Sequence, residues 1–273
     1  MFESIFKNIK ETFTSPFFLW FVGLSIFFWA LEIFFPWRKS QSIFRKDFWL
    51  DGFYMFFNLF IFPVLLLNFL ANITHHLLWL GLNNAGIYQL DLLHINHLPS
   101  WLQILIFFLL RDFVQFNIHR LLHRVDWLWQ FHKVHHSVKE MGFAAHLRYH
   151  WVEGIAYSLL QYIPLALLGM SVNDFTIMYV ITIAIGHFNH ANINVHLGWL
   201  KYILNNPQMH IWHHAKELPK KYGVNFGLTL SVWDYLFSTN YIPTSGRDVE
   251  LGFDDEKSFP KRFLGQFIFP LKK

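Results

Sequence analysis

The chain has 273 residues, of which 54% are hydrophobic and 20% aromatic, and its mean hydropathy of +0.29 is high for a soluble protein. Charged residues make up only 15%, and the absence of cysteine excludes disulfides, thiolate metal ligands, iron–sulfur clusters and thiol nucleophiles. We therefore expect an all-α integral membrane protein in which any metal is bound by His, Asp or Glu. Lys and Arg residues in cytoplasmic loops account for the net charge of +4, so no nucleic-acid partner is predicted.

The first third of the chain alternates between apolar runs and polar loops. Apolar positions at helical spacing in residues 2–13 predict a short helix lying on the membrane surface, and no cleaved signal peptide is expected. The stretch from Pro16 to Pro36 is almost wholly apolar and long enough to span a bilayer, which takes roughly 20 residues. A second apolar run, residues 53–82, is interrupted at Pro63 and predicts one tilted or kinked span.

The distribution of Lys and Arg predicts the topology. Four basic residues lie in segment 38–46 after the first span, whereas segment 81–100 has none, so the earlier loop is predicted to be cytoplasmic. A third span begins at Trp101 and continues past Arg111 as a polar-faced helix that returns to the cytoplasmic side.

Two further apolar runs lie between Gly154 and Ile185 and predict a hairpin whose first helix is short enough to be re-entrant. In total we expect about four to five transmembrane or re-entrant helices with a cytoplasmic, helical, histidine-rich metal-binding cap. No linker is apparent, so one membrane domain is predicted. It comprises spans in residues 1–110, a histidine-rich region in 111–243 and a C-terminal tail in 244–273.

The 17 histidines are concentrated in a few segments. The spacing His-x-x-His-His occurs twice, as HKVHH and HIWHH, and the pairs in HRLLH and HFNH have helical spacing. Since residues three and four apart share a helix face, each His-x-x-His-His triplet is predicted to offer three nitrogens to one place on the cytoplasmic surface. The predicted metal ligands are His119, His123, His132, His135, His136, His187, His190, His210, His213 and His214.

One metal ion uses about three to five imidazoles, so ten converging histidines imply two ions. Asp112, seven residues before His119, falls on nearly the same helix face and could orient a ligand ring. The pair His146 and His150 has i, i+4 spacing, and ligand, orienting and structural roles remain open for it. Further candidate partners of the ligand rings are Asp126, Glu140, Glu153, Asn189, Asn192, Asn225 and Asp234. Isolated histidines are expected to be interfacial or hydrogen-bonding residues, namely His75, His76, His94, His97 and His196.

A histidine-only cage suits iron, zinc or copper on ligand type alone. Hydrolytic zinc sites need fewer ligands than ten, together with a nearby acid or base. Two redox-active ions can share the electrons needed to split O2, and the apolar chain suits a hydrocarbon substrate. The pattern favours an O2-dependent oxidoreductase. The alternative is a non-redox membrane metalloprotein, such as a zinc-dependent lipid hydrolase or a metal-handling protein.

The motifs HRLLH, HKVHH and HIWHH, with HFNHAN before the last, resemble those of the fatty acid hydroxylase and sterol desaturase superfamily. The likeness covers about residues 112–243, the expected catalytic region, and includes Arg148, His150 and Glu153 as an Arg-x-His-x-x-Glu element. It departs from the family in Trp151, where proline is common, and in the additional His146.

The resemblance implies a membrane di-iron oxygenase that hydroxylates or desaturates a lipid at a cytoplasmic active site, using O2. It implies iron ligation by nine of the ten histidines named above, with His187 as a further candidate. The sequence has no haem, nucleotide or iron–sulfur motif, so electrons are expected from a separate donor protein or small reductant.

Overall fold

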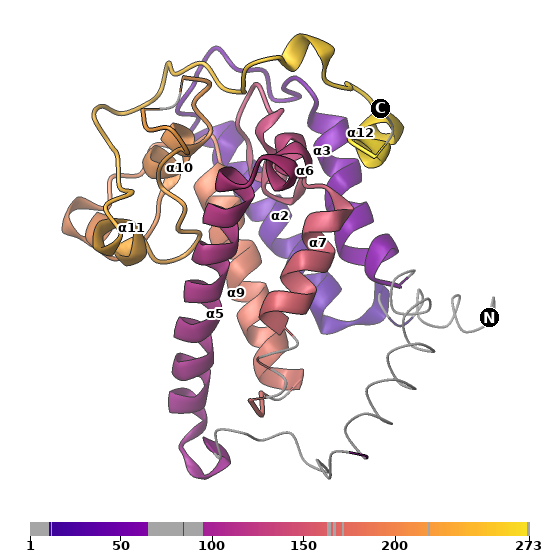
Figure 1. The fold of residues 1–273 in the computed structure, drawn as a ribbon, viewed down its shortest axis with the longest axis vertical. Coiled ribbons are helices and arrows are strands. Elements are labelled where there is room, and N and C mark those ends of the chain that lie inside the picture. Colours follow the sequence, from indigo (N-terminus) through magenta and orange to yellow (C-terminus); the bar gives the residue numbers. More distant parts are fainter. Residues whose placement is uncertain are drawn as a thin grey trace.

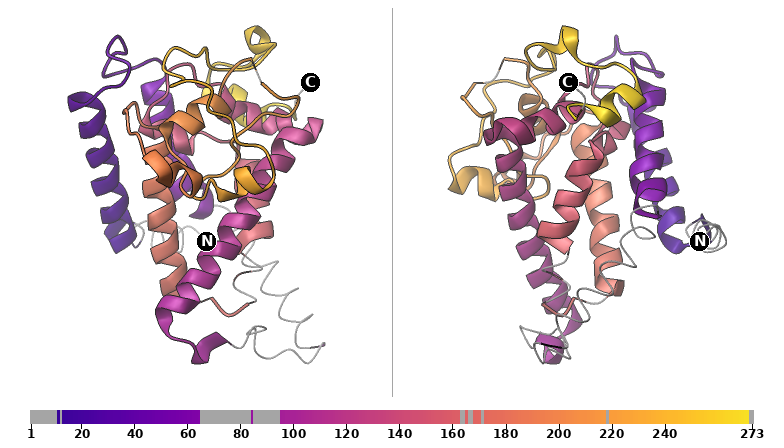
Figure 2. Two further views of the ribbon diagram at one scale, coloured as in Figure 1. Left: turned by 90° about the vertical axis from the view of Figure 1, so that its left-hand side faces the viewer. Right: turned by 45° about the vertical axis from the view of Figure 1, so that its right-hand side comes forward.

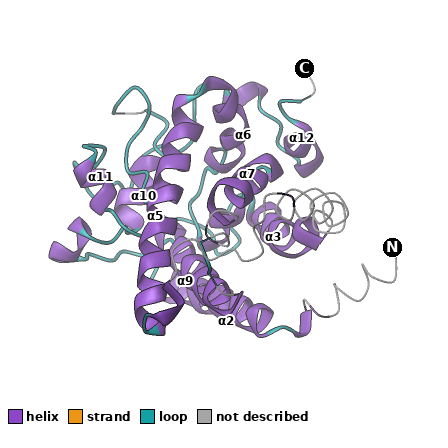
Figure 3. Ribbon diagram, turned by 60° about the horizontal axis from the view of Figure 1, so that its bottom comes forward, coloured by secondary structure: helices purple, strands orange, loops and turns teal. Residues whose placement is uncertain are grey.

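The computed structural model describes residues 11, 13–64, 84, 95–162, 165, 168–170, 172–217 and 219–271. Within these residues the chain forms helices and loops, with three isolated bridges and no strand, which confirms the all-α prediction for this part (Figure 3). The α-helices are α2 (Pro16–Phe34), α3 (Phe48–Phe56), α5 (Ser100–Arg124), α6 (Asp126–His136), α7 (Trp151–Tyr157), α9 (Val172–His190), α10 (Pro207–His213), α11 (Val232–Leu236) and α12 (Phe263–Ile268).

The longer helices α2, α5 and α9 extend toward one end of the molecule, while α6, α10, α11 and α12 gather at the other (Figure 1). Helix α9 lies between α2 and α5 and packs against both (Figure 2). Both α5 and α9 run toward the end that holds the short helices, so their C-terminal histidines arrive together there.

Helices α2 and α5 are long and apolar enough to cross a membrane. Helix α2 begins where Ser15 accepts a hydrogen bond from the Phe18 N–H at 3.2 Å and Pro16 occupies the first turn. Only Phe21 and Phe28 of α2 are buried, and large apolar side chains such as Trp20 and Phe27 are exposed, as suits lipid. The predicted first span is therefore confirmed as a helix.

The second apolar run forms α3 and continues without a break through a π-helical segment, η1 (Phe57–Ile61). The remainder of that run, from residue 65, and most of the predicted surface helix lie outside the described residues. The predicted hairpin is present as α7 with the π-helical η4 (Ser158–Tyr162), followed by α9. Of the four to five predicted spans, the described residues contain two helices that meet the length and composition of a span.

Helix α5 continues through the apolar run into the first histidine pair, as the sequence predicted, but it ends at Arg124. Val125 is extended, with φ −103° and ψ 112°, and α6 starts at Asp126. HRLLH and HKVHH therefore lie on two helices that pack against each other.

Candidate metal centre

Nine of the ten predicted ligands are brought together in two groups of buried histidines. Within each group, one ring nitrogen from every histidine lies within 4.8 Å of those of the others. The first group contains His119 and His123 from α5, His132 and His136 from α6, and His213 from α10. The second contains His135 from α6, His190 from α9, and His210 and His214 from α10 and its C-cap.

The two His-x-x-His-His triplets are each divided between the groups, so the prediction that each triplet serves one place is wrong. Neighbouring residues on an α-helix point about 100° apart, because one turn takes 3.6 residues. His135 and His136 therefore direct their rings to different groups, and His213 and His214 do the same. The rings of His136 and His214 stack between the groups, with centroids 4.4 Å apart.

Five of the rings are oriented by hydrogen bonds from Nδ1. The acceptors are the carbonyls of Phe226 for His119 (2.8 Å), Val224 for His213 (2.8 Å), Arg148 for His135 (3.1 Å) and Gly186 for His190 (2.8 Å), and the carboxylate of Glu153 for His132 (2.8 Å). A carbonyl oxygen can only accept, so Nδ1 carries the proton and Nε2 presents a lone pair. These partners set the nitrogen that each ring offers to a metal.

The lone pairs on the Nε2 atoms of these rings point toward one another, with no proton between them. The Nε2 atoms of His119 and His132 are 3.2 Å apart, and those of His135 and His190 are 3.4 Å apart. The Nε2 atoms of His123, His136 and His213 are buried with no hydrogen-bond partner. Such an arrangement is unfavourable unless a cation lies among the nitrogens.

The nitrogen spacing fits first-row metal ions. Two nitrogens that each lie about 2.1 Å from one ion are themselves about 3.0 to 3.4 Å apart in octahedral or tetrahedral geometry. Burial lowers the pKa of both His132 and His135 to about 3. Burial, followed by neighbouring histidines, also holds the pKa of His136 and His214 well below its usual value. The rings are therefore neutral at physiological pH, which is the form that binds metal.

His187 lies in neither group. Its Nε2 is 3.3 Å from the Ser25 hydroxyl of α2, and its ring packs against Phe28 and Phe143. Although it is only three residues from His190 on α9, its ring is turned toward α2 and the His190 ring toward α10.

Two candidates in the Arg-x-His-x-x-Glu element take different roles. Glu153 holds the His132 ring, and burial raises the pKa of this carboxyl to about 7. His150 instead caps α7: its Nδ1 accepts from the Val152 N–H at 3.1 Å, and its Nε2 donates to the Phe267 carbonyl at 2.9 Å. Both nitrogens of His150 are thus used by the backbone.

Three other candidate partners contact mainly the backbone. Asp234 accepts from the N–H groups of Phe226 and Gly227, each at 2.8 Å. Asp112 accepts from the Trp233 indole at 2.9 Å, and from the Thr229 and Leu230 N–H groups at 3.3 and 3.1 Å. Asn192 bonds the backbone of Arg38. Asp112 and Asp234 therefore fix the segment whose carbonyls orient His119 and His213.

The sequence did not reveal the carbonyl acceptors, nor the ion pairs that hold one of them. Arg148, whose carbonyl orients His135, is buried and its guanidinium lies 3.1 Å from Asp51 of α3. Asp51 also pairs with Arg45 at 2.6 Å. The only signal for this network was the Arg-x-His-x-x-Glu element, which does not point to Asp51.

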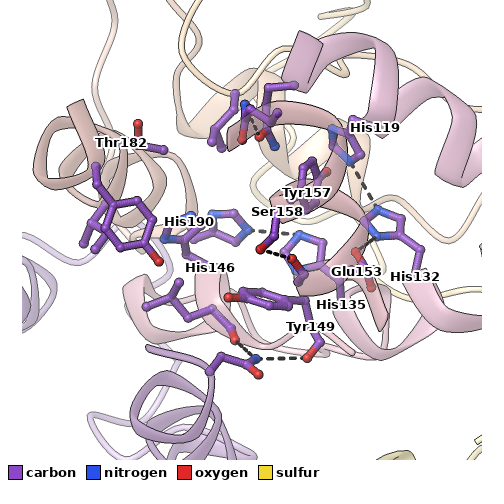
Figure 4. Close-up of a pocket in the computed structure, with 18 of the residues that line it drawn as sticks. His119, His132, His135, His146, Tyr149, Glu153, Tyr157, Ser158, Thr182 and His190 are labelled. Atoms are coloured by element: carbon purple, nitrogen blue, oxygen red, sulfur yellow. Dashed lines mark hydrogen bonds and ion pairs between the residues drawn. The ribbon is translucent and has the colours of Figure 1, made fainter. Parts of the chain in front are cut away.

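Both groups border one cavity with a volume of about 180 Å³ (Figure 4). Five histidines of the two groups line it, namely His119, His132, His135, His190 and His210. Side chains of η1, α5, α7, η4 and α9, together with residues 146–149, line most of the remainder. His146 also faces the cavity; its ring lies against Gly186 and its centroid is 5.4 Å from that of His190.

Comparison with known proteins agrees with this geometry. Residues 104–239 match the model of the fatty acid hydroxylase family. The chain is 31% identical over 175 residues to ornithine lipid hydroxylase OlsE from Rhizobium tropici, an alignment that covers 64% of this chain and 52% of the relative.

Two other relatives are more distant or align over a shorter part. Human alkylglycerol monooxygenase is 30% identical over 47% of this chain and 28% of its own length, and the rice (Oryza sativa subsp. japonica) very-long-chain aldehyde decarbonylase GL1-10 is 28% identical over 50% and 46%. The chain thus spans about half or less of the length of these relatives. No solved structure matches it.

Proposed function

Since the chain belongs to the fatty acid hydroxylase family, we propose that it is a membrane-bound di-iron oxidoreductase that hydroxylates or desaturates a lipid with O2 and electrons from a separate donor. The observation that carries the proposal is the pair of buried histidine-only groups, whose facing lone pairs call for two cations beside one cavity. The relatives named as lipid hydroxylase and alkylglycerol monooxygenase support a lipid substrate.

We assign one iron to each group, so that the first is held by five histidines and the second by four. Histidine nitrogens suit iron, zinc and copper alike, and the family membership favours iron. Bound iron would supply the redox chemistry that activates O2, with electrons from the separate donor. The single membrane domain, with residues 111–243 as its catalytic region, remains part of this proposal.

The protein's own groups hold the ligands and enclose the reaction. The Glu153 carboxylate and the Phe226 and Arg148 carbonyls keep the ring protons on Nδ1, so that Nε2 is available to a metal. The nine rings are buried, which limits access of water to the site. The cavity positions a lipid against His119, His135 and their neighbours, because these rings form part of its wall.

We further propose that the chain crosses the membrane several times and that the histidine groups lie on the cytoplasmic face. The basic loop after α2 supports this, because Arg38 bonds Asn192, two residues beyond His190. The loop with the predicted cytoplasmic location and the histidines are therefore at the same end of the molecule (Figure 1).

Iron content and O2-dependent turnover test the proposal together. Protein purified from membranes should hold about two irons per chain, and a lipid extract given O2 and reductant should gain one oxygen or lose two hydrogens in mass. His213→Ala should deplete the first group, His214→Ala the second, and each should abolish turnover. His196→Ala, an exposed histidine outside both groups, is the matched control. Lipid conversion without O2 or reductant would refute the oxygenase and favour a hydrolase.

A further inference from the structure

The two histidine groups differ in size. Among the described residues, five histidines form the first group, whereas the second consists of His135, His190, His210 and His214. One metal ion uses about three to five imidazoles, so the second group has room for one more ligand. Three of its four rings, those of His135, His190 and His210, also line the cavity. A further ligand can therefore reach the second group from the cavity side.

His146 is a histidine on that side. It belongs to η3 (Phe143–Leu147), lines the cavity and lies beside His190 (Figure 4). The centroids of the His146 and His190 rings are 5.4 Å apart. Within the second group, the ring centroids are 4.1 Å apart for His190 and His210 and 6.3 Å apart for His135 and His210. The His146 ring is thus as close to His190 as ligands of this group are to one another.

The backbone of α9 leaves space for the His146 ring. Gly186 lies one helical turn before His190, and its carbonyl accepts a hydrogen bond from His190 Nδ1 at 2.8 Å. A Cβ atom at position 186 would collide with Cε1 and both nitrogens of His146. The edge of the ring that contains the nitrogens therefore rests against the glycine, and any side chain there would displace it. On one face of α9, adjacent turns hold His190 and accommodate His146.

The surrounding protein leaves one nitrogen of this ring unpaired. His146 Nδ1 is buried and has no hydrogen-bond partner among the described residues. By contrast, His150, four residues further on, bonds the backbone through both of its nitrogens. A buried nitrogen without a partner is costly, so an apolar side chain such as those of the neighbouring Ala144 and Ala145 would serve packing better. A metal ion bound to the ring removes that cost.

We propose that His146 is a fifth ligand of the metal bound by the second group. His146 is not among the histidines whose nitrogens lie within 4.8 Å of one another, so its ring moves from Gly186 toward His190 when the metal binds. Both metals then have five imidazole ligands, and His146 is the ligand of the second metal on the cavity side. The inference rests on the two-metal site of the proposed function, but it does not depend on the reaction with O2.

Cobalt(II) binding to the full chain in detergent tests the ligand without O2, reductant or lipid. Chelator competition measures the affinity, and the difference in visible absorption between wild type and His214→Ala gives the spectrum of the second cobalt. His146→Ala should weaken the second cobalt at least about tenfold, which is the lower end of the loss caused by removing even an outer partner of a ligand. Four-coordinate cobalt absorbs visible light more strongly than five-coordinate cobalt, so the absorption of the second cobalt should increase. Unchanged affinity and absorption would refute the proposal.

Added imidazole distinguishes a ligand from a residue that acts through packing. In His146→Ala, imidazole should enter the space beside the cavity and return the affinity and the absorption of the second cobalt toward wild type. His187→Ala is the matched control, because it removes a buried histidine whose ring centroid is 5.6 Å from that of His146. This variant should retain wild-type affinity and absorption. Weaker binding in His146→Ala that imidazole does not restore, or equal weakening in His187→Ala, would overturn the proposal.

A second variant covers the case in which His146→Ala does not fold, as judged by thermal melting of the metal-free protein. His146→Gln keeps a polar side chain of similar volume but removes the imidazole, so it should show the same loss of affinity and the same gain in absorption. A folded His146→Gln variant that binds both cobalt ions as tightly as wild type would refute the role of His146.

The outcomes for ligation and for turnover are separable. If cobalt binding depends on His146 but no lipid is oxidised in the presence of O2 and reductant, the oxygenase proposal fails and the ligand assignment stands. If lipids are oxidised while His146→Ala binds metal like wild type, the ligand assignment fails alone. Protein that binds no metal at either group would overturn both.

Discussion

The hydrogen bond between Glu153 and His132 offers a sharp test of how the first histidine group is held. The Glu153 carboxylate lies 2.8 Å from His132 Nδ1, and both side chains are almost completely buried. Replacing Glu153 with Ala removes the acceptor and leaves a buried N–H without a partner. The ring can then rotate or change tautomer, which presents a protonated Nε2 to the metal.

The size of the effect follows from the bond. A buried hydrogen bond to a charged group contributes about 1.5 to 3 kcal/mol, and about 1.4 kcal/mol corresponds to a factor of ten in affinity. Glu153→Ala should therefore weaken metal binding at the first group about ten- to a hundredfold. Glu153→Gln keeps a carbonyl acceptor at the same place, so it should lose less, and the difference between wild type and Glu153→Gln measures the contribution of the charge.

Competition with a graded series of chelators measures the affinity, and metal analysis gives the stoichiometry. As chelator increases, Glu153→Ala should lose one metal per chain before the other, while wild type retains both. Glu250→Gln, whose side chain is 71% exposed in an ion pair with Lys216, controls for loss of a carboxylate. If Glu153→Ala holds both metals as tightly as wild type, the carboxylate does not orient His132 and the reasoning is refuted.

Four further predictions follow from the geometry. Asp234→Asn should lower the melting temperature and weaken the first group, because the N–H groups of Phe226 and Gly227 lose a charged acceptor and the Phe226 carbonyl then moves away from His119; calorimetry and metal analysis on one preparation check this. His187→Ala should retain the metal content of wild type, because His187 belongs to neither group; loss of one metal would make it a ligand. Gly186→Ala should destabilise the protein by about 1 to 3 kcal/mol, since the added Cβ would collide with the His146 ring, and denaturant unfolding would detect it. Metal-free protein should lose the contribution of His132 and His135 to stability as pH falls below the unfolded histidine pKa of 6.5 toward their folded pKa of about 3, because these two rings gain protons there only in the unfolded state. Above pH 6.5 these two histidines should not make stability depend on pH. Melting temperatures measured across this pH range test the prediction.

Periodicity predicted the features that depend on residues close in sequence. The continuation of the third apolar run into the first histidine pair is observed in α5, and the position of His187 and His190 at the end of a helix is observed in α9. The spacing of the histidines also predicted all nine ligands that the fold brings together. Helical geometry is local, so the residues themselves contain this information.

The partners of the ligands depend on contacts that span long stretches of sequence. The Phe226 carbonyl lies 107 residues from His119, and every residue has a carbonyl, so no residue type marks it. Asp112 was expected to orient a ligand because it shares a helix face with His119. It lies about two turns away along the axis, however, and the backbone near Thr229 is closer. The break at Val125 had no glycine or proline to signal it.

The division of the triplets between the two groups gives the His-x-x-His-His spacing a physical role. Helix α5 contributes only to the first group and α9 only to the second, whereas α6 and α10 each contribute to both. Any shift of α6 or α10 therefore changes both groups at once, because His135 and His136, or His213 and His214, are adjacent on one backbone. The ion pair of Arg148 with Asp51 anchors the carbonyl that accepts a hydrogen bond from His135 of α6. The contacts of Asp234 anchor the segment whose carbonyl accepts a hydrogen bond from His213 of α10. These anchors hold the distance between the groups constant, which is what two metals acting on one O2 molecule would require.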